Sequence, residues 1–146
     1  MEIVAFDPGI TTGWAGFDSS TYCSGVVDSS LCKIEQLLDN LEPKVVGYED
    51  FKHRPNMMRA ELYSIQVIGV VRLWCEKRGI EPFRYLPATA KAFWDDKKLR
   101  LIGLYRLTQH ERDATRVLLK YLSDSDKDWH DSTINSLRPS TDLRSP

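Results

Sequence analysis

The first sixteen residues constrain the fold of this chain more than any other stretch. Residues 2–6 are a short apolar run, which predicts a buried β-strand, and Asp7 follows at its end. Proline and glycine then break the strand over residues 8–13, and an extended pattern resumes over residues 13–18, so a hairpin is predicted. An ionised carboxylate at the end of a core strand must be paired, hydrogen-bonded or bound to a metal. Asp7 therefore marks a candidate functional site.

Length and composition predict one globular domain followed by a polar tail. The chain has 146 residues, of which 42% are hydrophobic, enough for a single core over residues 1–122. Residues 123–146 are rich in Ser, Asp, Thr and Pro and are expected to be disordered. No apolar run is long enough to cross a bilayer and no signal peptide is recognisable, so we expect a soluble, cytoplasmic protein without a membrane partner. The three cysteines lack CxxC spacing, which argues against a disulfide framework or a zinc site.

Charge is distributed unevenly along the chain, although the formal net charge is only −1. Residues 1–49 carry 2 basic and 8 acidic side chains, whereas residues 50–120 carry 15 basic and 8 acidic side chains. An acidic first third beside a basic middle fits a protein whose carboxylates bind metal while its Lys and Arg side chains meet phosphate. Ordinary solvated helix faces would produce the same distribution, so charge alone leaves both interpretations open.

Five strands are predicted, and they form a mixed sheet flanked by helices in an α/β fold. Beyond the hairpin, the extended segments are residues 21–28, 44–49 and 81–86. The first three strands are joined by short turns, so they should pair antiparallel. An amphipathic helix over residues 31–41, capped by a serine, precedes the fourth strand, so a crossover can place that strand parallel to the first. Glu49, at the end of the fourth strand, then lies beside Asp7.

The other segments predict helices around the sheet. Residues 50–57 form a polar, basic loop before a long helix over residues 58–78. That helix is apolar over more than one stripe, which fits either a homodimer face or a central helix wrapped within one chain. Three segments follow the fifth strand: a short helix from Pro87 to Trp94, a polar junction at residues 95–98, and a helical segment over residues 99–122 with a break near residues 108 and 109.

Acidic side chains from three segments can meet at one place. Asp7 and Glu49 end neighbouring strands, and Asp113 lies three residues after His110 in a helix, so the last two side chains share one helix face. Carboxylates with an occasional imidazole suit Mg²⁺, for which Mn²⁺ substitutes, and two such ions per site can hydrolyse a phosphodiester. These four are the predicted catalytic and metal-binding residues of a nuclease. Three of them have an ordinary alternative: a turn cap for Asp7, an ion pair with the basic loop for Glu49, and a helix terminus for His110.

These features resemble the RuvC family of Holliday junction resolvases. The resemblance lies in Asp-Pro-Gly-Ile-Thr-Thr-Gly-Trp-Ala at residues 7–15, Val-Val-Gly-Tyr-Glu at residues 45–49 and His-x-x-Asp-Ala at residues 110–114. It extends over residues 2–122 and implies an RNase H-like nuclease domain that acts as a homodimer and cuts two strands of a four-way junction. By position, the implied metal ligands are Asp7, Glu49, His110 and Asp113. The short spacing between Pro87 and His110 suits a compact, phage-encoded member.

Basic and aromatic side chains of the middle segment are the predicted contacts to DNA. The basic side chains would bind phosphates, and the aromatic ring would stack on an unpaired base. These residues are Phe51, Lys52, Arg54, Arg59, Lys97, Lys98 and Arg106. The predicted partner is branched DNA, either four-way junctions or flaps and forks.

Two other functions use the same residues. A module of this fold would bind branched DNA without cutting it, although all four candidate ligands are present. Residues 7–13 also resemble the first phosphate loop of actin-like and sugar-kinase ATPases, in which Thr11 and Thr12 would cradle phosphate. Those ATPases need two such domains, and 146 residues leave no room for the second. The sequence therefore favours the nuclease.

Overall fold

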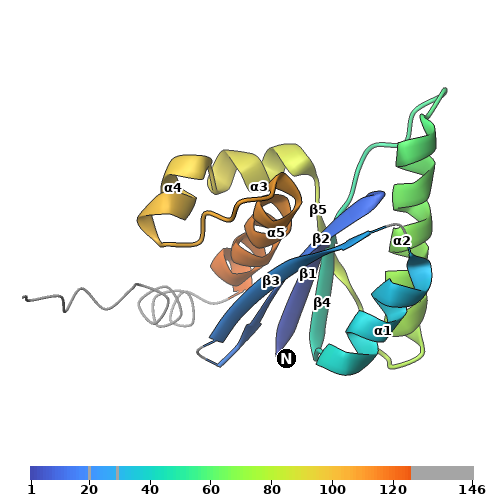
Figure 1. Cartoon of the computed structure of the whole chain (residues 1–146), viewed down its shortest axis with the longest axis horizontal. Coiled ribbons are helices and arrows are strands. Elements are labelled where there is room, and N and C mark those ends of the chain that lie inside the picture. The colour runs from blue at the N-terminus through green and yellow to red at the C-terminus, as the bar shows by residue number, and fades with distance from the viewer. Residues whose placement is uncertain (20, 29, 126–146) are drawn as a thin grey trace, which may run out of the picture.

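The computed structural model describes residues 1–19, 21–28 and 30–125 of the chain. It is an α/β fold built on one five-stranded sheet with the strand order β3-β2-β1-β4-β5 (Figure 1). The strands are β1 (Ile3–Asp7), β2 (Thr11–Asp18), β3 (Thr21–Asp28), β4 (Val45–Glu49) and β5 (Phe83–Tyr85). The helices are α1 (Leu31–Leu41), α2 (Arg59–Glu76), α3 (Pro87–Phe93), α4 (Asp96–Leu101) and α5 (Gln109–Ser125).

The pairing of the strands confirms the predicted mixed sheet. β1 pairs with β2 and β2 with β3 in antiparallel fashion, whereas β1 pairs with β4 and β4 with β5 in parallel. Tight turns produce the antiparallel pairs, and the parallel pairs need the helical connections that separate these strands in the sequence. Phe6 of β1 pairs with Tyr48 of β4, so the residues that follow, Asp7 and Glu49, lie at the same edge of the sheet.

Helices cover both faces of the sheet. Alternate residues of β1 point to opposite faces, as the two-residue period of a strand requires. Ile3 and Ala5 join the core beneath α3, α4 and α5, whereas Val4 and Phe6 join the core beneath α1 and α2. Figure 1 shows these two groups of helices on either side of the sheet. Burial on both faces explains why β1 is an uninterrupted apolar run.

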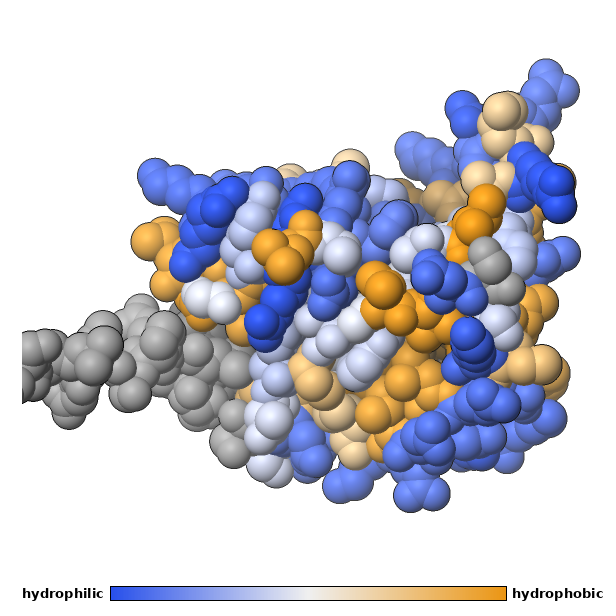
Figure 2. All heavy atoms as spheres, viewed as in Figure 1, coloured by the Kyte–Doolittle hydropathy of each residue, from blue (hydrophilic) through white to orange (hydrophobic). Residues whose placement is uncertain are grey.

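One chain leaves α2 partly uncovered. Its inner side packs into the core through Val67, Val71 and Trp74, whereas Leu62 is 50% exposed and Leu73 is 53% exposed. The sequence left two alternatives for this apolar helix, a homodimer face or a central helix wrapped within one chain. The exposed leucines contradict the second alternative. On the face seen in Figure 2, hydrophobic residues gather between β3 and α1, while hydrophilic residues dominate α4 and the outer end of α2. None of the helices in the described part of the chain is long and apolar enough to cross a membrane.

The structure differs from the sequence-based expectation between β5 and α5. Residues 95–98, expected as a polar junction, lie at the start of α4, because the Asp95 side chain accepts a hydrogen bond from the Lys98 backbone and caps that helix. α4 ends at Leu101, and Gly103 adopts a positive φ of 74°, which turns the chain away from the helix axis. The helix expected from residue 99 onward is therefore interrupted earlier than its pattern indicated.

The ends of two other elements also differ from expectation. α5 extends to Ser125, so the first residues of the expected tail 123–146 are helical, and residues 126–146 lie outside the described part. The Tyr85 hydroxyl donates a hydrogen bond to Asp124 at 2.6 Å, which ties this last turn to β5. β2 begins two residues earlier than expected because its first residue still pairs with β3. Contacts made across the fold set both ends.

Candidate active site

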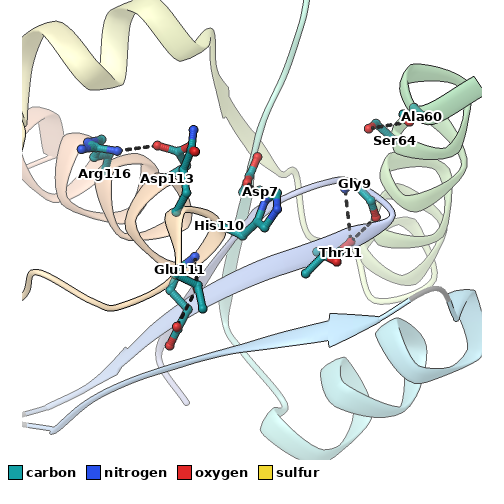
Figure 3. Close-up of polar contacts among 12 residues, drawn as sticks. Asp7, Gly9, Thr11, Ala60, Ser64, His110, Glu111, Asp113 and Arg116 are labelled. Carbon is teal, nitrogen blue, oxygen red and sulfur yellow. Dashed lines mark hydrogen bonds and ion pairs between the residues drawn. The ribbon is translucent and has the colours of Figure 1, made fainter. Parts of the chain in front are cut away.

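Two strand ends and the first turn of α5 form the candidate site. Asp7 ends β1 and Glu49 ends the neighbouring parallel strand β4. His110 belongs to the first turn of α5, and its Nδ1 atom lies 2.8 Å from Oδ2 of Asp7. Figure 3 shows these two side chains facing each other. Asp7 therefore pairs with a distant helix instead of capping its own turn.

A threonine closes the turn that follows β1. The Thr12 hydroxyl accepts a hydrogen bond from the Gly9 backbone at 3.3 Å and donates one to the Gly9 carbonyl at 2.9 Å. The Thr11 hydroxyl donates to Asp28 at 3.0 Å. Because the hydroxyl of Thr12 is engaged within the hairpin and that of Thr11 is engaged by the end of β3, they are not arranged as the phosphate loop of an actin-like ATPase.

The backbone of α5 approaches β2 very closely at Gly13. A Cβ atom on this glycine would stand 2.1 Å from the carbonyl oxygen of His110, a distance at which no side chain fits. Gly13 lies opposite Asp7 in the β1–β2 ladder. The absence of a side chain at Gly13 is therefore what lets His110 reach Asp7.

Burial makes the two strand-end carboxylates costly to ionise. Burial, together with the charges of Asp7 and Asp113, raises the pKa of Glu49 to about 8. Burial also raises the pKa of Asp7 to about 6, although the hydrogen bond with His110 opposes that shift. Oε2 of Glu49 is buried and has no hydrogen-bond partner among the described residues. A cation beside these oxygens would remove both penalties.

Asp113 lies one turn further along α5 and is engaged by basic side chains of the chain itself. It forms a hydrogen-bonded ion pair with the buried Arg116, and Nζ of Lys91 in α3 lies 3.4 Å from its Oδ2 atom. Arg116 also pairs with Asp96 and donates to the carbonyl of Trp94 at 2.9 Å. Figure 3 shows Asp113 joined to Arg116 and not to the strand-end pair. This network ties α5 to the segment between α3 and α4.

The donor set fits a divalent cation, although the side chains do not form a closed metal cage. Among the described residues, no three His, Cys, Asp or Glu side chains are grouped so that they hold a metal ion as they stand. The carboxylates of Asp7 and Glu49 and the imidazole of His110 are nevertheless donors that Mg²⁺ and Mn²⁺ accept. The unsatisfied Oε2 of Glu49 is the observation that supports a cation here. Asp113 would join these ligands only by giving up contacts with its two basic partners.

Solved structures of RuvC resemble this chain in fold. No family model and no curated protein matches the sequence. The structure of Thermus thermophilus RuvC in complex with a Holliday junction substrate matches with a TM-score of 0.60 and 17% identity, covering 80% of this chain and 90% of that one. A second Thermus thermophilus RuvC structure matches with a TM-score of 0.58 and 18% identity, with the same coverage. The chain has a RuvC-like fold. At such identity the likeness establishes the fold alone, and the chemistry rests on the residues.

Two basic residues of the candidate site were not among those predicted from the sequence. The charge of Lys91 opposes the rise that burial causes in the pKa of Asp7 and Glu49, and Arg116 contacts Asp113 directly. The sequence did contain a signal for the pair of Arg116 with Asp113, because the two residues are three positions apart, which is the spacing of an ion pair on a helix. Lys91 had none, because its helix is rich in alanine and indicated only close packing.

Four of the predicted DNA contacts lie in the loop between β4 and α2 or at the first residue of α2. Lys52 is exposed, and Arg54 forms an ion pair with Glu61 at 2.7 Å. Arg59 is exposed at the first position of α2. The ring of Phe51 is half-buried against the core beneath α2, so only part of it is available to a base.

The remaining predicted DNA contacts lie on the opposite flank of the sheet, in α4 and the loop that follows it (Figure 1). Lys97 is exposed, whereas Nζ of Lys98 donates a hydrogen bond to the Phe93 carbonyl at 2.6 Å. The guanidinium of Arg106 lies 4.6 Å from the centre of the Tyr22 ring. The structure thus divides the seven residues between two flanks of the RuvC-like sheet and does not gather them in one patch.

Proposed function

We propose that this chain is a metal-dependent, structure-specific endodeoxyribonuclease that resolves Holliday junctions or other branched DNA by phosphodiester hydrolysis. The observation that carries the proposal is the pair of largely buried carboxylates, Asp7 and Glu49, at one sheet edge, with one buried Glu49 oxygen lacking a partner among the described residues. Two carboxylates placed so close are costly to ionise without a cation. The RuvC-like fold supports the same reading, because one structure of that fold was solved with a Holliday junction substrate.

The residues of the site have separate tasks in this proposal. Asp7, Glu49, Asp113 and His110 would hold two Mg²⁺ ions, for which Mn²⁺ substitutes, and these ions would activate water and stabilise the leaving oxygen. The hydrogen bond between Nδ1 of His110 and Asp7 fixes the imidazole, which leaves Nε2 to bind a cation or to move a proton. Lys91 supplies a positive charge beside the carboxylates and so favours an approaching phosphate.

The DNA would be held from both flanks of the site. A hollow between α3, α4 and α5 is lined by Lys91, Gln109, Arg112 and Arg116 together with Asp95 and Asp96, and its basic side chains would bind a phosphate group. The predicted contacts Lys52, Arg54, Arg59, Lys97, Lys98 and Arg106 would bind phosphates further away, and the accessible part of Phe51 would stack on an unpaired base. The two basic flanks are separated, so the arms of a branched substrate could contact both of them, whereas one straight duplex would not. The proposal keeps the intracellular location expected from the sequence, because the substrate is cellular or phage DNA.

A homodimer is part of the proposal. The exposed side of α2 carries Leu62, Gln66, Gly69 and Leu73 at helical spacing. A Cβ atom on Gly69 would have no heavy atom within 4 Å, so a helix of a second copy has room to approach the backbone there. A dimer would bring two sites to one junction and allow both strands to be cut.

Cleavage of defined substrates tests the proposal. The full chain is incubated with synthetic four-way, three-way, flap and duplex DNA in the presence of Mg²⁺ or of EDTA. We expect paired nicks in the four-way junction with Mg²⁺ only, and we expect Asp7→Asn and Glu49→Gln to retain binding and lose cleavage. Asp18→Asn, at the exposed end of β2, is the matched control and should cleave normally. Cleavage that survives both site variants would contradict the proposal.

The engagement of Asp113 favours a second candidate function. Because Arg116 and Lys91 already balance its charge, the chain is compatible with a module that binds branched DNA and does not cut it. The same experiment separates the two functions. A module would bind the four-way junction in preference to duplex and leave it intact at every metal concentration.

A further inference from the structure

The loop between α4 and α5 presents an apolar side chain to solvent. Leu107 is 97% exposed, more than any other large hydrophobic residue in the described part of the chain; Leu101, the next, is 72% exposed. Leu107 lies three residues before His110, at the entry to the helix that carries the candidate site. Its side chain contributes almost nothing to the core.

The exposure of Leu107 does not reflect a loosely held loop. The guanidinium of Arg112 donates hydrogen bonds to the carbonyl oxygens of Arg106 and Leu107 at 2.8 and 2.9 Å. The Thr108 hydroxyl accepts a hydrogen bond from the backbone of Glu111 at 3.2 Å and donates one to its carboxylate at 2.7 Å. The backbone on both sides of the leucine is therefore tied to the first turns of α5.

Leu107 does not serve as the apolar residue that packs against the first turns of a capped helix either. An apolar residue just before a helix cap commonly packs against the fourth residue of the helix, and Leu107 occupies that place before the capping Thr108. The fourth residue here is Arg112, whose guanidinium is bound to the loop carbonyls. Leu107 thus lacks the apolar partner that this position usually provides.

Positive charge surrounds the base of the loop. The guanidinium groups of Arg100 and Arg112 lie 3.5 and 4.7 Å from the centre of the Tyr105 ring, and that of Arg106 stacks on Tyr22. The nearby acid, Glu111, is occupied by hydrogen bonds with Thr108 and with Ser24. An exposed apolar tip between arginines held on aromatic rings is complementary to a stack of bases between phosphates.

We propose that Leu107 is a wedge that enters the base stack of branched DNA near the branch point, while Arg100, Arg106 and Arg112 contact the flanking phosphates. Apolar side chains that insert between base steps pay less for unstacking where the stack is already interrupted, as it is at a branch. This inference rests on the proposed function, because it takes branched DNA as the partner. It assigns to Leu107 the task of recognising the branch, which is separate from cutting.

Fluorescence of a base analogue tests the wedge. A four-way junction carrying 2-aminopurine next to the branch point is titrated with the full-length Glu49→Gln protein in EDTA, so that cleavage plays no part. We expect binding to raise the fluorescence, and the additional change Leu107→Ala to abolish that rise and to weaken junction binding roughly tenfold, the order expected for one lost contact with a base. Leu107→Met should restore most of the signal, and affinity for plain duplex should stay unchanged.

Leu101→Ala is the matched control, because it removes the same side chain from another exposed position at the end of α4. It should leave the fluorescence rise intact. A rise that persists in Leu107→Ala, or that is lost equally in Leu101→Ala, overturns the wedge and leaves the proposed function standing. Failure of the parent protein to prefer the junction over duplex overturns the proposed function itself, and the wedge with it.

Discussion

Nδ1 of His110 lies 2.8 Å from Oδ2 of Asp7, which joins residues 103 positions apart in the sequence. The contact brings the first turn of α5 to the end of β1. It depends on the close approach of α5 to β2 at Gly13, which lies opposite Asp7 in the β1–β2 ladder.

Gly13→Ala should separate His110 from Asp7. The added methyl group would stand 2.1 Å from the His110 carbonyl oxygen, so α5 has to move away from β2. We expect a loss of about 1–3 kcal/mol in the free energy of unfolding, measured with urea, as for other overpacked sites, together with strongly reduced cleavage. Gly16→Ala is the control, because the atoms nearest to its added methyl group, the Met1 sulfur at 3.2 Å and the Ile3 carbonyl oxygen at 3.3 Å, lie more than 1 Å further away than the His110 carbonyl oxygen lies at Gly13. Equal losses in the two variants would contradict this account.

Glu49→Gln should stabilise the metal-free protein at alkaline pH. Burial, assisted by the charges of Asp7 and Asp113, raises the pKa of Glu49 from 4.5 to about 8, so the folded chain keeps a proton that the unfolded chain loses earlier. The stability of the unmodified protein should therefore fall as pH rises from about 4.5 to about 8, because the unfolded state binds fewer protons in that window. Glu49→Gln removes this term. Melting temperatures at pH 5 and pH 9 in EDTA measure it, and parallel pH profiles for the two proteins would refute it.

Divalent cations should reverse the alkaline loss of stability. An ion that binds the folded chain alone contributes about 2.7 kcal/mol at a hundred times its dissociation constant. We expect Mn²⁺ to raise the melting temperature of the unmodified protein at pH 8 and to have little effect on Asp7→Asn. Asp18→Asn, which alters an exposed acid outside the site, should respond like the unmodified protein. Equal responses from all three proteins would place the ion elsewhere.

Arg116→Met should destabilise the fold strongly. Arg116 is buried and pairs with Asp113 and Asp96, so its removal leaves a buried carboxylate without its closest counter-charge. We expect a loss of about 3–5 kcal/mol in the free energy of unfolding at pH 7. Lys44→Met breaks an exposed pair with Glu2 and should cost less than about 1 kcal/mol. A small effect of Arg116→Met would contradict this account.

Gly69→Ala should weaken the proposed dimer and spare the monomer. Within one chain no heavy atom lies within 4 Å of the added methyl group, and alanine favours a helix over glycine by about 1 kcal/mol. Any loss must therefore arise from a second copy packed against α2. Sedimentation equilibrium measures the dissociation constant, and urea unfolding at low concentration measures the monomer. Glu76→Ala, at the end of the same helix, is the control. Unchanged association in Gly69→Ala would move the interface elsewhere.

Local patterns predicted most of the sheet and its order. The apolar run before Asp7 and the alternation in the next two strands indicate a meander, and the helix before β4 makes that strand parallel to β1. The proximity of Asp7 and Glu49 followed directly, because parallel neighbours end at the same edge. The cap at Asp95 was missed, although a helix-capping side chain is a local feature, because four consecutive charged residues suggested a loop.

The sequence by itself determined the strands, their order and the two carboxylates that end them, because strand periodicity and turn chemistry act over a few neighbouring residues. Only the tertiary structure decided that His110 binds Asp7, that Arg116 and Lys91 engage Asp113, and that Leu107 points outward. These relationships depend on how α3 and α5 pack against the sheet. Packing depends on many weak contacts between segments that are distant in the sequence, and no local stretch of sequence reveals which of these contacts form.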